Sequence, residues 1–354
     1  MSERLDNYRL LGRSGLRVSP LALGTMTFGV PQAWGTDQAE ASRIFEIYAE
    51  QGGNFVDTAN FYADGGSERI VSKLVHGRRE RFVIATKYSL TMRRGDPNAS
   101  GNHRKNMVRS VEDSLLRLDS DYIDLLYLHV WDERTPVEEI LRAFDDLVRA
   151  GKVLYVGLSD TPAWQASRMQ AIAELRGWSP LIALQIPYNL TERTVERDLI
   201  PMAREMGMGV LPWSPLAGGV LAGKYVANDL ERLPGRSNPT LDTRKDINLA
   251  TGRLNERNLA ISRVANAVAA ELRCTPAQLA LAWTLLNPAV VAPILGTRTR
   301  AQLQDNLGAL DVCFGEEQVE RLDAASRVEP GFPQSLLRSA AMTSMFGGVR
   351  VAER

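Results

Sequence analysis

Short apolar runs alternate with amphipathic segments from one end of the chain to the other. The apolar runs are rich in Val, Ile and Leu and do not alternate with polar residues, which is typical of strands that are buried on both faces. These predicted strands occupy residues 21–24, 54–57, 82–87, 122–129, 153–159, 181–185, 209–213 and 290–296. Predicted helices occupy residues 37–51, 67–76, 104–118, 136–149, 162–176, 194–206, 256–287 (two helices) and 300–310. Eight strands, each followed by a helix, predict an α/β fold of the (β/α)8 or TIM-barrel type, with a doubly wound sheet as the alternative.

The remaining segments predict additions to this barrel. Residues 8–19 form two short runs around a Ser-Gly turn, and we expect a β-hairpin there that caps one end of the barrel. Residues 91–103, 217–255 and the tail of about 328–354 are longer than minimal connections, as binding loops and lids usually are. We expect the long loops to lie at the carboxyl ends of the strands. No break in composition indicates a second domain, so residues 1–354 are expected to form one.

Polar residues stand where several of the predicted strands end. Asp57, Lys87 and His129 close the second, third and fourth strands, and Tyr62 lies in the loop after Asp57. Because reacting groups of such barrels sit where strands end, we expect these four side chains to meet at one mouth. Taken singly, each has an ordinary structural explanation, such as a helix cap, a packed ring or a solvated charge. Their occurrence together favours a catalytic site.

These four residue types suit proton transfer to a carbonyl oxygen. A phenol is a weak acid near neutral pH, and a nearby ammonium group favours its ionised form, so Lys87 is expected to lower the pKa of Tyr62. Asp57 would hold Lys87 by an ion pair, and His129 would orient the carbonyl. Side chains are poor hydride donors, so a reduction at this site requires a cofactor.

Composition and charge exclude several other classes. Lys and Arg number 42, as do Asp and Glu, so the chain lacks the basic excess of a nucleic-acid-binding protein. Two cysteines without a CxxC pair fit a reducing compartment. Neither a signal peptide nor a membrane span is predicted, and we expect a cytoplasmic protein. The three histidines share no ligand spacing, so no metal site is predicted.

Four stretches resemble one enzyme family. "NFVDTANFYADGGSE", "RFVIATK", "YIDLLYLHVWD" and "GKVLYVGLSD" are similar to successive motifs of the aldo-keto reductases, and the resemblance runs from about residue 8 to residue 312. It implies a barrel with an N-terminal hairpin, and NADPH-dependent, reversible reduction of an aldehyde or ketone. It also implies that Asp57, Tyr62, Lys87 and His129 are catalytic.

The resemblance further implies a nicotinamide cofactor site. "WSPLAGGVLAGK" is similar to the family's loop over the cofactor, and "LGTRTRAQLQDNLGAL" to its site for the adenosine half. Arg298 and Arg300 favour NADP(H), with NAD(H) as the alternative. One residue departs from the family pattern, because Asp160 stands where Asn is usual. The predicted cofactor-binding residues are Gly24, Thr25, Met26, Asp57, Ser159, Asp160, Gln185, Trp213, Ser214, Pro215, Leu216, Gly218, Lys224, Gly296, Thr297, Arg298, Gln302, Asp305 and Asn306.

The substrate is expected to be a small carbonyl compound or alcohol. We predict a pocket that includes Trp34, Tyr62, His129 and Trp131, with a wall formed by residues 91–103 and 225–250. Two other functions fit the same residues. The protein could act mainly as an alcohol or sugar dehydrogenase, or as a cofactor-binding regulatory subunit resembling the β subunits of potassium channels. The oligomeric state is not predicted.

Overall fold

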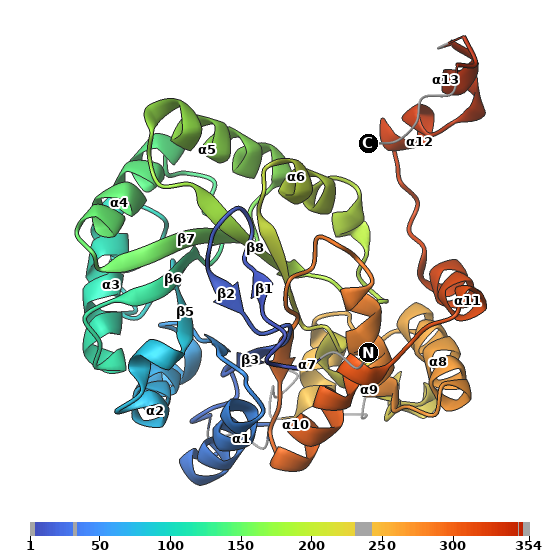
Figure 1. Cartoon of the computed structure of the whole chain (residues 1–354), viewed down its shortest axis with the longest axis horizontal. Coiled ribbons are helices and arrows are strands. Elements are labelled where there is room, and N and C mark those ends of the chain that lie inside the picture. The colour runs from blue at the N-terminus through green and yellow to red at the C-terminus, as the bar shows by residue number, and fades with distance from the viewer. Residues whose placement is uncertain (1–3, 31–33, 231–242, 346, 350–354) are drawn as a thin grey trace.

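The computed structural model describes residues 4–30, 34–230, 243–345 and 347–349. At its centre eight parallel strands lie in the order β10, β3, β4, β5, β6, β7, β8, β9 (Figure 1). A parallel bridge between Val210 and Val290 brings the two edges together, so the sheet is nearly closed. The strands are β3 (Ala22–Gly24), β4 (Phe55–Asp57), β5 (Val83–Tyr88), β6 (Ile123–Leu128), β7 (Val153–Ser159), β8 (Leu181–Pro187), β9 (Gly209–Trp213) and β10 (Ile294–Gly296). The predicted (β/α)8 barrel is confirmed.

Helices surround the barrel, as Figure 1 shows. They are α1 (Gln38–Glu50), α2 (Gly66–Val75), α3 (Arg104–Leu118), α4 (Val137–Arg149), α5 (Ala163–Arg176), α6 (Leu199–Glu205), α8 (Glu256–Glu271), α9 (Pro276–Leu285) and α10 (Arg300–Leu307). Short 3₁₀ helices are η1 (Tyr62–Gly65), η2 (Arg79–Arg81), η3 (Thr194–Glu196), η4 (Ala217–Ala222), η5 (Ala227–Leu230) and η6 (Gly308–Asp311). Within the described residues, no helix combines the length and the apolarity needed to cross a membrane.

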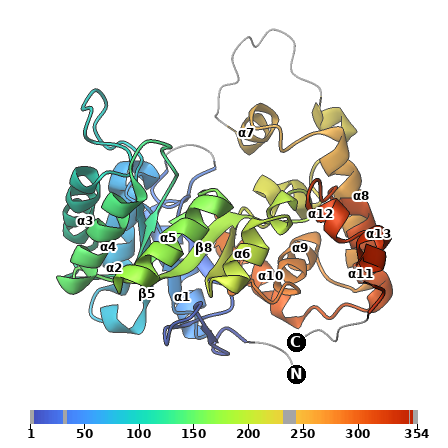
Figure 2. The same ribbon diagram turned by 90° about the horizontal axis from the view of Figure 1, so that it is seen from above.

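The N-terminal hairpin is also confirmed. Strands β1 (Arg9–Leu10) and β2 (Arg17–Val18) pair antiparallel, and the fully buried Leu11 and Val18 pack with side chains of the barrel interior. The hairpin closes one end of the barrel. Residues 91–103 and helix α7 (Arg244–Ala250) rise from the opposite face (Figure 2).

The two-residue period of the strands decides which side chains point into the barrel. In β5, Val83 and Ala85 belong to the interior cluster, whereas Ile84 belongs to the layer between strands and helices. Successive side chains of a strand point to opposite faces, so Lys87 continues the inward row of Val83 and Ala85. By the same rule Asp57 continues the inward row of Phe55. Parallel strands end at one rim, and the inward polar residues therefore meet there.

Several helices were not predicted from the sequence. They are α7, α11 (Glu316–Ser326), α12 (Gln334–Leu337) and α13 (Ala340–Met345). The start of α11 carries recognisable signals, since two acidic residues fill its first turn and the Gln318 side chain accepts a hydrogen bond from the Gly315 N–H. The predicted helix 194–206 is divided into η3 and α6, and the last predicted strand is shorter than expected. Of the predicted long segments, residues 231–242, 346 and 350–354 lie outside the described residues.

Candidate active site

A buried ion pair lies at the carboxyl rim of the barrel. The Lys87 Nζ donates hydrogen bonds to Asp57 Oδ2 at 2.6 Å and to the Thr58 carbonyl oxygen at 2.7 Å. The Lys87 side chain is fully buried, and that of Asp57 is 4% exposed. Burial alone would lower the pKa of Lys87, but the Asp57 carboxylate and the Tyr62 phenol together raise it. The amine therefore stays protonated although water is excluded.

Tyr62 contacts this ion pair directly. It begins η1, and the Lys87 Nζ donates to its hydroxyl oxygen at 3.3 Å. Lys87 lowers the pKa of Tyr62 as the sequence predicted, but burial has the larger effect and the pKa is raised overall. The expected net lowering is thus corrected, because the phenol is removed from water as well as placed beside a cation. The phenol stays protonated near neutral pH, as a proton donor must.

His129 completes the group next to Tyr62. Its ring centroid lies 6.0 Å from that of Tyr62, at an interplanar angle of 82°. Burial, followed by the charge of Lys87, lowers the pKa of His129 to about 3. Its Nδ1 is buried and, within the residues that the structure describes, has no hydrogen-bond partner. His129 is therefore a neutral imidazole at the site. We call Asp57, Tyr62, Lys87 and His129 the catalytic end of the site, after the role that the sequence predicts for them.

Two further polar contacts lie at this rim of the barrel. The Gln185 Nε2 donates to Asp57 Oδ1 at 2.8 Å, which fixes the second carboxylate oxygen. The Trp213 Nε1 donates to Asp160 Oδ1 at 3.0 Å. From the sequence, both Gln185 and Asp160 were expected only as cofactor ligands. In the structure each also orients another residue of the predicted site.

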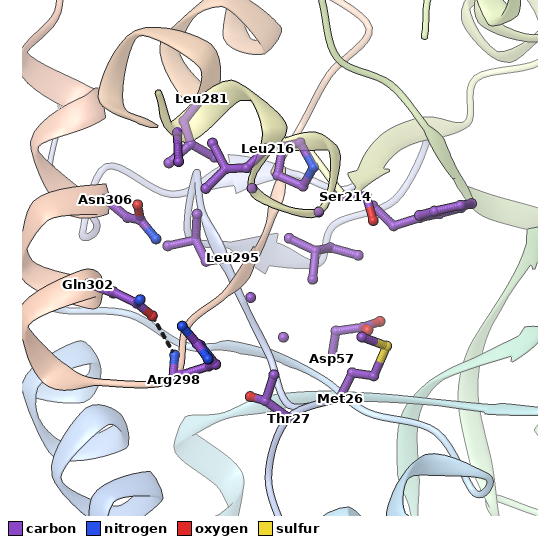
Figure 3. A pocket seen from close by; sticks show the side chains of 18 of the residues that line it. Met26, Thr27, Asp57, Ser214, Leu216, Leu281, Leu295, Arg298, Gln302 and Asn306 are labelled. Carbon is purple, nitrogen blue, oxygen red and sulfur yellow. Dashed lines mark hydrogen bonds between the residues drawn. The ribbon is translucent and has the colours of Figure 1, made fainter. Parts of the chain in front are cut away.

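A cavity of about 510 Å³ runs from the catalytic end toward α10. Figure 3 shows Asp57 and Met26 on one side of it, and Arg298, Gln302 and Asn306 on the other. Of the predicted cofactor-binding residues, two do not line this cavity. Both are fully buried beside it: Thr25 donates its hydroxyl hydrogen to the Asp57 carbonyl oxygen at 3.0 Å, and Thr297 accepts from Thr27 through its carbonyl oxygen. The predicted residues that line it are Gly24, Met26, Asp57, Ser159, Asp160, Gln185, Trp213, Ser214, Pro215, Leu216, Gly218, Lys224, Gly296, Arg298, Gln302, Asp305 and Asn306.

Basic side chains gather at the other end of the cavity. Lys224, Arg244 and Arg298 all line it, and we call them the cationic end. Burial lowers the pKa of Lys224, and the neighbouring Arg298 and Arg244 lower it further. Burial likewise lowers the pKa of Arg244, with Arg253 and Arg298 adding to the effect. In the described part of the chain, no carboxylate forms an ion pair with Lys224 or Arg244. Lys224 and Arg244, two neighbouring cations without a carboxylate partner among the described residues, suit a ligand with phosphate groups.

The sequence did not single out Arg244, Phe61 or Leu90, although all three line the cavity. Arg244 lies in the long predicted segment 217–255. Its basic side chain was the only feature of the sequence that pointed to a role in binding. The two tryptophans predicted for the substrate pocket are not among the residues that line the cavity. Trp131 packs against the hydrophobic core, and Trp34 lies beneath the Arg244 guanidinium, 5.3 Å from the ring centroid. The described residues contain no group of three or more His, Cys, Asp or Glu placed to hold a metal ion.

The site thus joins two kinds of chemistry in one cavity. Its catalytic end offers a protonated phenol, an ammonium group and a neutral imidazole, which together can bind and protonate a carbonyl oxygen. Its cationic end offers charges that a pyrophosphate or a ribose phosphate would neutralise. A dinucleotide fits this arrangement, because it carries phosphates at a distance from its reactive ring.

Comparisons with known proteins agree with this chemistry. The model of the "Aldo/keto reductase family" matches residues 20–327. The chain is 36% identical to the norsolorinic acid reductase of Aspergillus flavus over 346 residues, which cover 94% of this chain and 84% of that protein. It is 39% identical to the uncharacterized oxidoreductase YrpG of Bacillus subtilis, over 89% of this chain and 94% of that protein. It is 36% identical to the NADP(+) aryl-alcohol dehydrogenase of Phanerodontia chrysosporium, over 94% of this chain and 89% of that protein.

Proposed function

Because the chain belongs to the aldo/keto reductase family and is thus an oxidoreductase, we propose that it reduces an aldehyde or ketone to the alcohol with NADPH. The observation that carries this proposal is the contact, at 3.3 Å, of the Lys87 ammonium group with the hydroxyl of Tyr62, a residue that lines the cavity. A proton donor and a cation beside it are what the oxygen of a carbonyl needs as it gains negative charge.

Each residue of the catalytic end has a distinct role in this proposal. Tyr62 donates its hydroxyl proton to the carbonyl oxygen. Lys87 stabilises the negative charge left on the phenol oxygen, and Asp57 keeps Lys87 charged and in place. His129, neutral and next to Tyr62, orients the carbonyl oxygen by a hydrogen bond. The reverse sequence of proton transfers serves alcohol oxidation, so the same residues support both directions.

The cofactor that fits the cavity is NADP(H). When bound, its nicotinamide would supply the hydride, with the ring next to Tyr62 and Trp213. Lys224 and Arg244 would contact the pyrophosphate, and Arg298 would pair with the ribose phosphate that distinguishes NADP from NAD. Gln302 is already hydrogen-bonded to the Arg298 backbone N–H at 2.9 Å, which fixes the start of α10 (Figure 3).

We propose an aromatic carbonyl compound as the substrate class. Met26, Phe61 and Leu90 give the catalytic end apolar walls. Phe61 is 44% exposed, which leaves its ring available to pack against a ligand. Two of the relatives are named for norsolorinic acid and for aryl alcohols, and the second name specifies an aromatic compound. The second of these names favours one further function for this chain, the oxidation of an aryl alcohol.

A direct test measures NADPH consumption with an aromatic aldehyde such as 4-nitrobenzaldehyde. Tyr62→Phe should lower kcat by about 10²–10⁴-fold, because it removes a positioned general acid. The Kd for NADPH should change little. Tyr8→Phe is the matched control, since Tyr8 is an exposed residue of the hairpin region at the opposite end of the barrel. Equal turnover by wild type and Tyr62→Phe would refute the assigned proton donor. NADPH binding without turnover on a broad panel of carbonyls and alcohols would favour the regulatory-subunit alternative.

A further inference from the structure

We propose that Asp160 makes the site prefer the oxidised cofactor: its carboxylate attracts the positively charged ring of NADP+ and not the neutral ring of NADPH. This inference rests on the proposed function, which places the nicotinamide next to Tyr62. It assigns to Asp160 a role that an amide side chain at the same position could not perform.

The geometry holds the Asp160 carboxylate in place. Asp160 directly follows β7 and has a positive φ of 40°, a conformation that Asp and Asn tolerate better than other side chains. Its Oδ1 accepts the hydrogen bond of the Trp213 indole at 3.0 Å, and both residues line the cavity. Within the described residues no lysine or arginine forms an ion pair with it. The carboxylate is thus fixed at the catalytic end without a cationic partner in contact.

The surrounding charges leave the charge of Asp160 unbalanced. Lys87 from β5 and Asp57 from β4 form an ion pair and neutralise each other. Tyr62 and His129 are neutral, and Arg253 lies over the Trp213 ring, 5.6 Å from its centroid. Burial raises the pKa of Asp160, whereas the Trp213 hydrogen bond and the charge of Lys87 lower it. Above that pKa Asp160 adds a negative charge beside the catalytic end, whose own charges balance.

The negative charge of Asp160 affects the binding of NADP+ and of NADPH differently. In carbonyl reduction two electrons and one proton leave the cofactor as hydride and bond to the carbonyl carbon, and the Tyr62 proton goes to the oxygen. The cofactor ring gains one positive charge in the process. A single unscreened charge a few ångströms from the ring, in a partly buried site, changes an affinity by about tenfold or more. Asp160 therefore stabilises the complex with NADP+, which forms when the carbonyl is reduced.

The test compares dissociation constants of NADP+ and NADPH, measured by titration calorimetry, for wild type and Asp160→Asn. Asn keeps an oxygen that accepts the Trp213 N–H and tolerates the same backbone conformation, so the substitution removes the charge alone. The ratio of Kd(NADPH) to Kd(NADP+) should fall about tenfold in Asp160→Asn. This fall in the ratio should result from weaker binding of NADP+. In wild type the ratio should also fall as the pH drops through the pKa of Asp160, and in Asp160→Asn it should not.

Two further variants keep the test decisive. Asp121→Asn removes an exposed carboxylate just before β6, at the amino end of the barrel, and should leave the ratio unchanged. Trp213→Phe removes the indole N–H but keeps the Asp160 carboxylate, and should retain the preference for NADP+. An unchanged ratio in Asp160→Asn, or a lost preference in Trp213→Phe alone, would overturn the inference and leave the proposed function standing. Failure of the wild-type protein to bind either dinucleotide would overturn both.

Discussion

Each end of the cavity includes a lysine, the fully buried Lys87 at the catalytic end and the partly exposed Lys224 at the cationic end, and the pKa values of the two lysines move in opposite directions. Burial lowers the pKa of both. At the catalytic end the Asp57 carboxylate and the Tyr62 phenol together outweigh that effect, and the pKa of Lys87 is raised. At the cationic end the neighbours of Lys224 are arginines, which lower its pKa further. A carboxylate partner reverses the effect of burial at Lys87, whereas the arginines near Lys224 add to it.

At the catalytic end the protein itself balances the charges, whereas at the cationic end Lys224 and Arg244 would need an anionic ligand to balance theirs. The charges of Asp57 and Lys87 balance each other before any substrate arrives, so the catalytic end is preorganised. The charges of the cationic end repel one another, and an anionic ligand would relieve that repulsion. Substitutions at the two ends should therefore have opposite consequences for the protein without ligand.

Lys87→Met is expected to have the largest effect. It removes the cation that stabilises the Tyr62 oxygen, and carbonyl reduction should slow by about 10²–10³-fold while the Kd for NADPH changes little. It also leaves the Asp57 carboxylate buried and unpaired, which should lower the free energy of unfolding by about 3–5 kcal/mol. Steady-state kinetics, cofactor titration and urea denaturation measure the three quantities.

Lys73→Met provides the control for this change. Lys73 is an exposed residue of α2 whose Nζ donates to Gln38 Oε1, so its substitution should alter neither rate nor stability appreciably. Turnover by Lys87→Met at the wild-type rate would remove Lys87 from the proposed mechanism.

Arg244→Gln tests the cationic end of the cavity. Loss of a charged phosphate contact should weaken NADPH binding by about 10- to 30-fold, with kcat nearly unchanged. The apoprotein should be no less stable than wild type, because the substitution removes a repelling charge. Added salt should weaken wild-type NADPH binding more steeply than that of the variant. Lys245→Gln is the matched control, since the adjacent Lys245 is paired with Asp229 at 2.8 Å. A destabilised Arg244→Gln apoprotein with normal affinity would contradict the role of the cationic end.

The catalytic end was much more predictable from the sequence than the cationic end. Asp57 is the last residue of β4 and Lys87 the last but one of β5, and the two-residue period of a strand together with the parallel sheet determines where such residues point. Tyr62 follows at a short distance along the chain, so its position could also be anticipated. Local periodicity was sufficient for Asp57 and Lys87, which belong to strands, and for His129, which directly follows β6.

Arg244 illustrates why the rest could not be predicted. It reaches the cavity from α7, a seven-residue helix in a long connection, and its position depends on packing against distant segments such as the loop that contains Trp34. The direction of the Tyr62 pKa was mistaken for a related reason. The sequence shows that a lysine is available, but it does not show how completely the phenol is removed from water.

His129 should produce the smallest of these effects, a pH dependence of stability. Its pKa in the folded protein is about 3, below the ordinary value of about 6.5 for an unfolded chain. Between these values the unfolded state binds a proton that the folded state does not, so stability is present above about pH 6.5 and falls as the pH is lowered. The free energy of unfolding should drop by about 1 kcal/mol between pH 6.5 and pH 5.5 because of this residue, a decline that His129→Gln should lack. Urea denaturation at both pH values measures it, with the exposed His76 replaced by Gln as the control. An identical decline in wild type and His129→Gln would mean that the imidazole binds its proton equally in the folded and unfolded states, and would contradict the neutral imidazole that the proposed mechanism requires below pH 6.5.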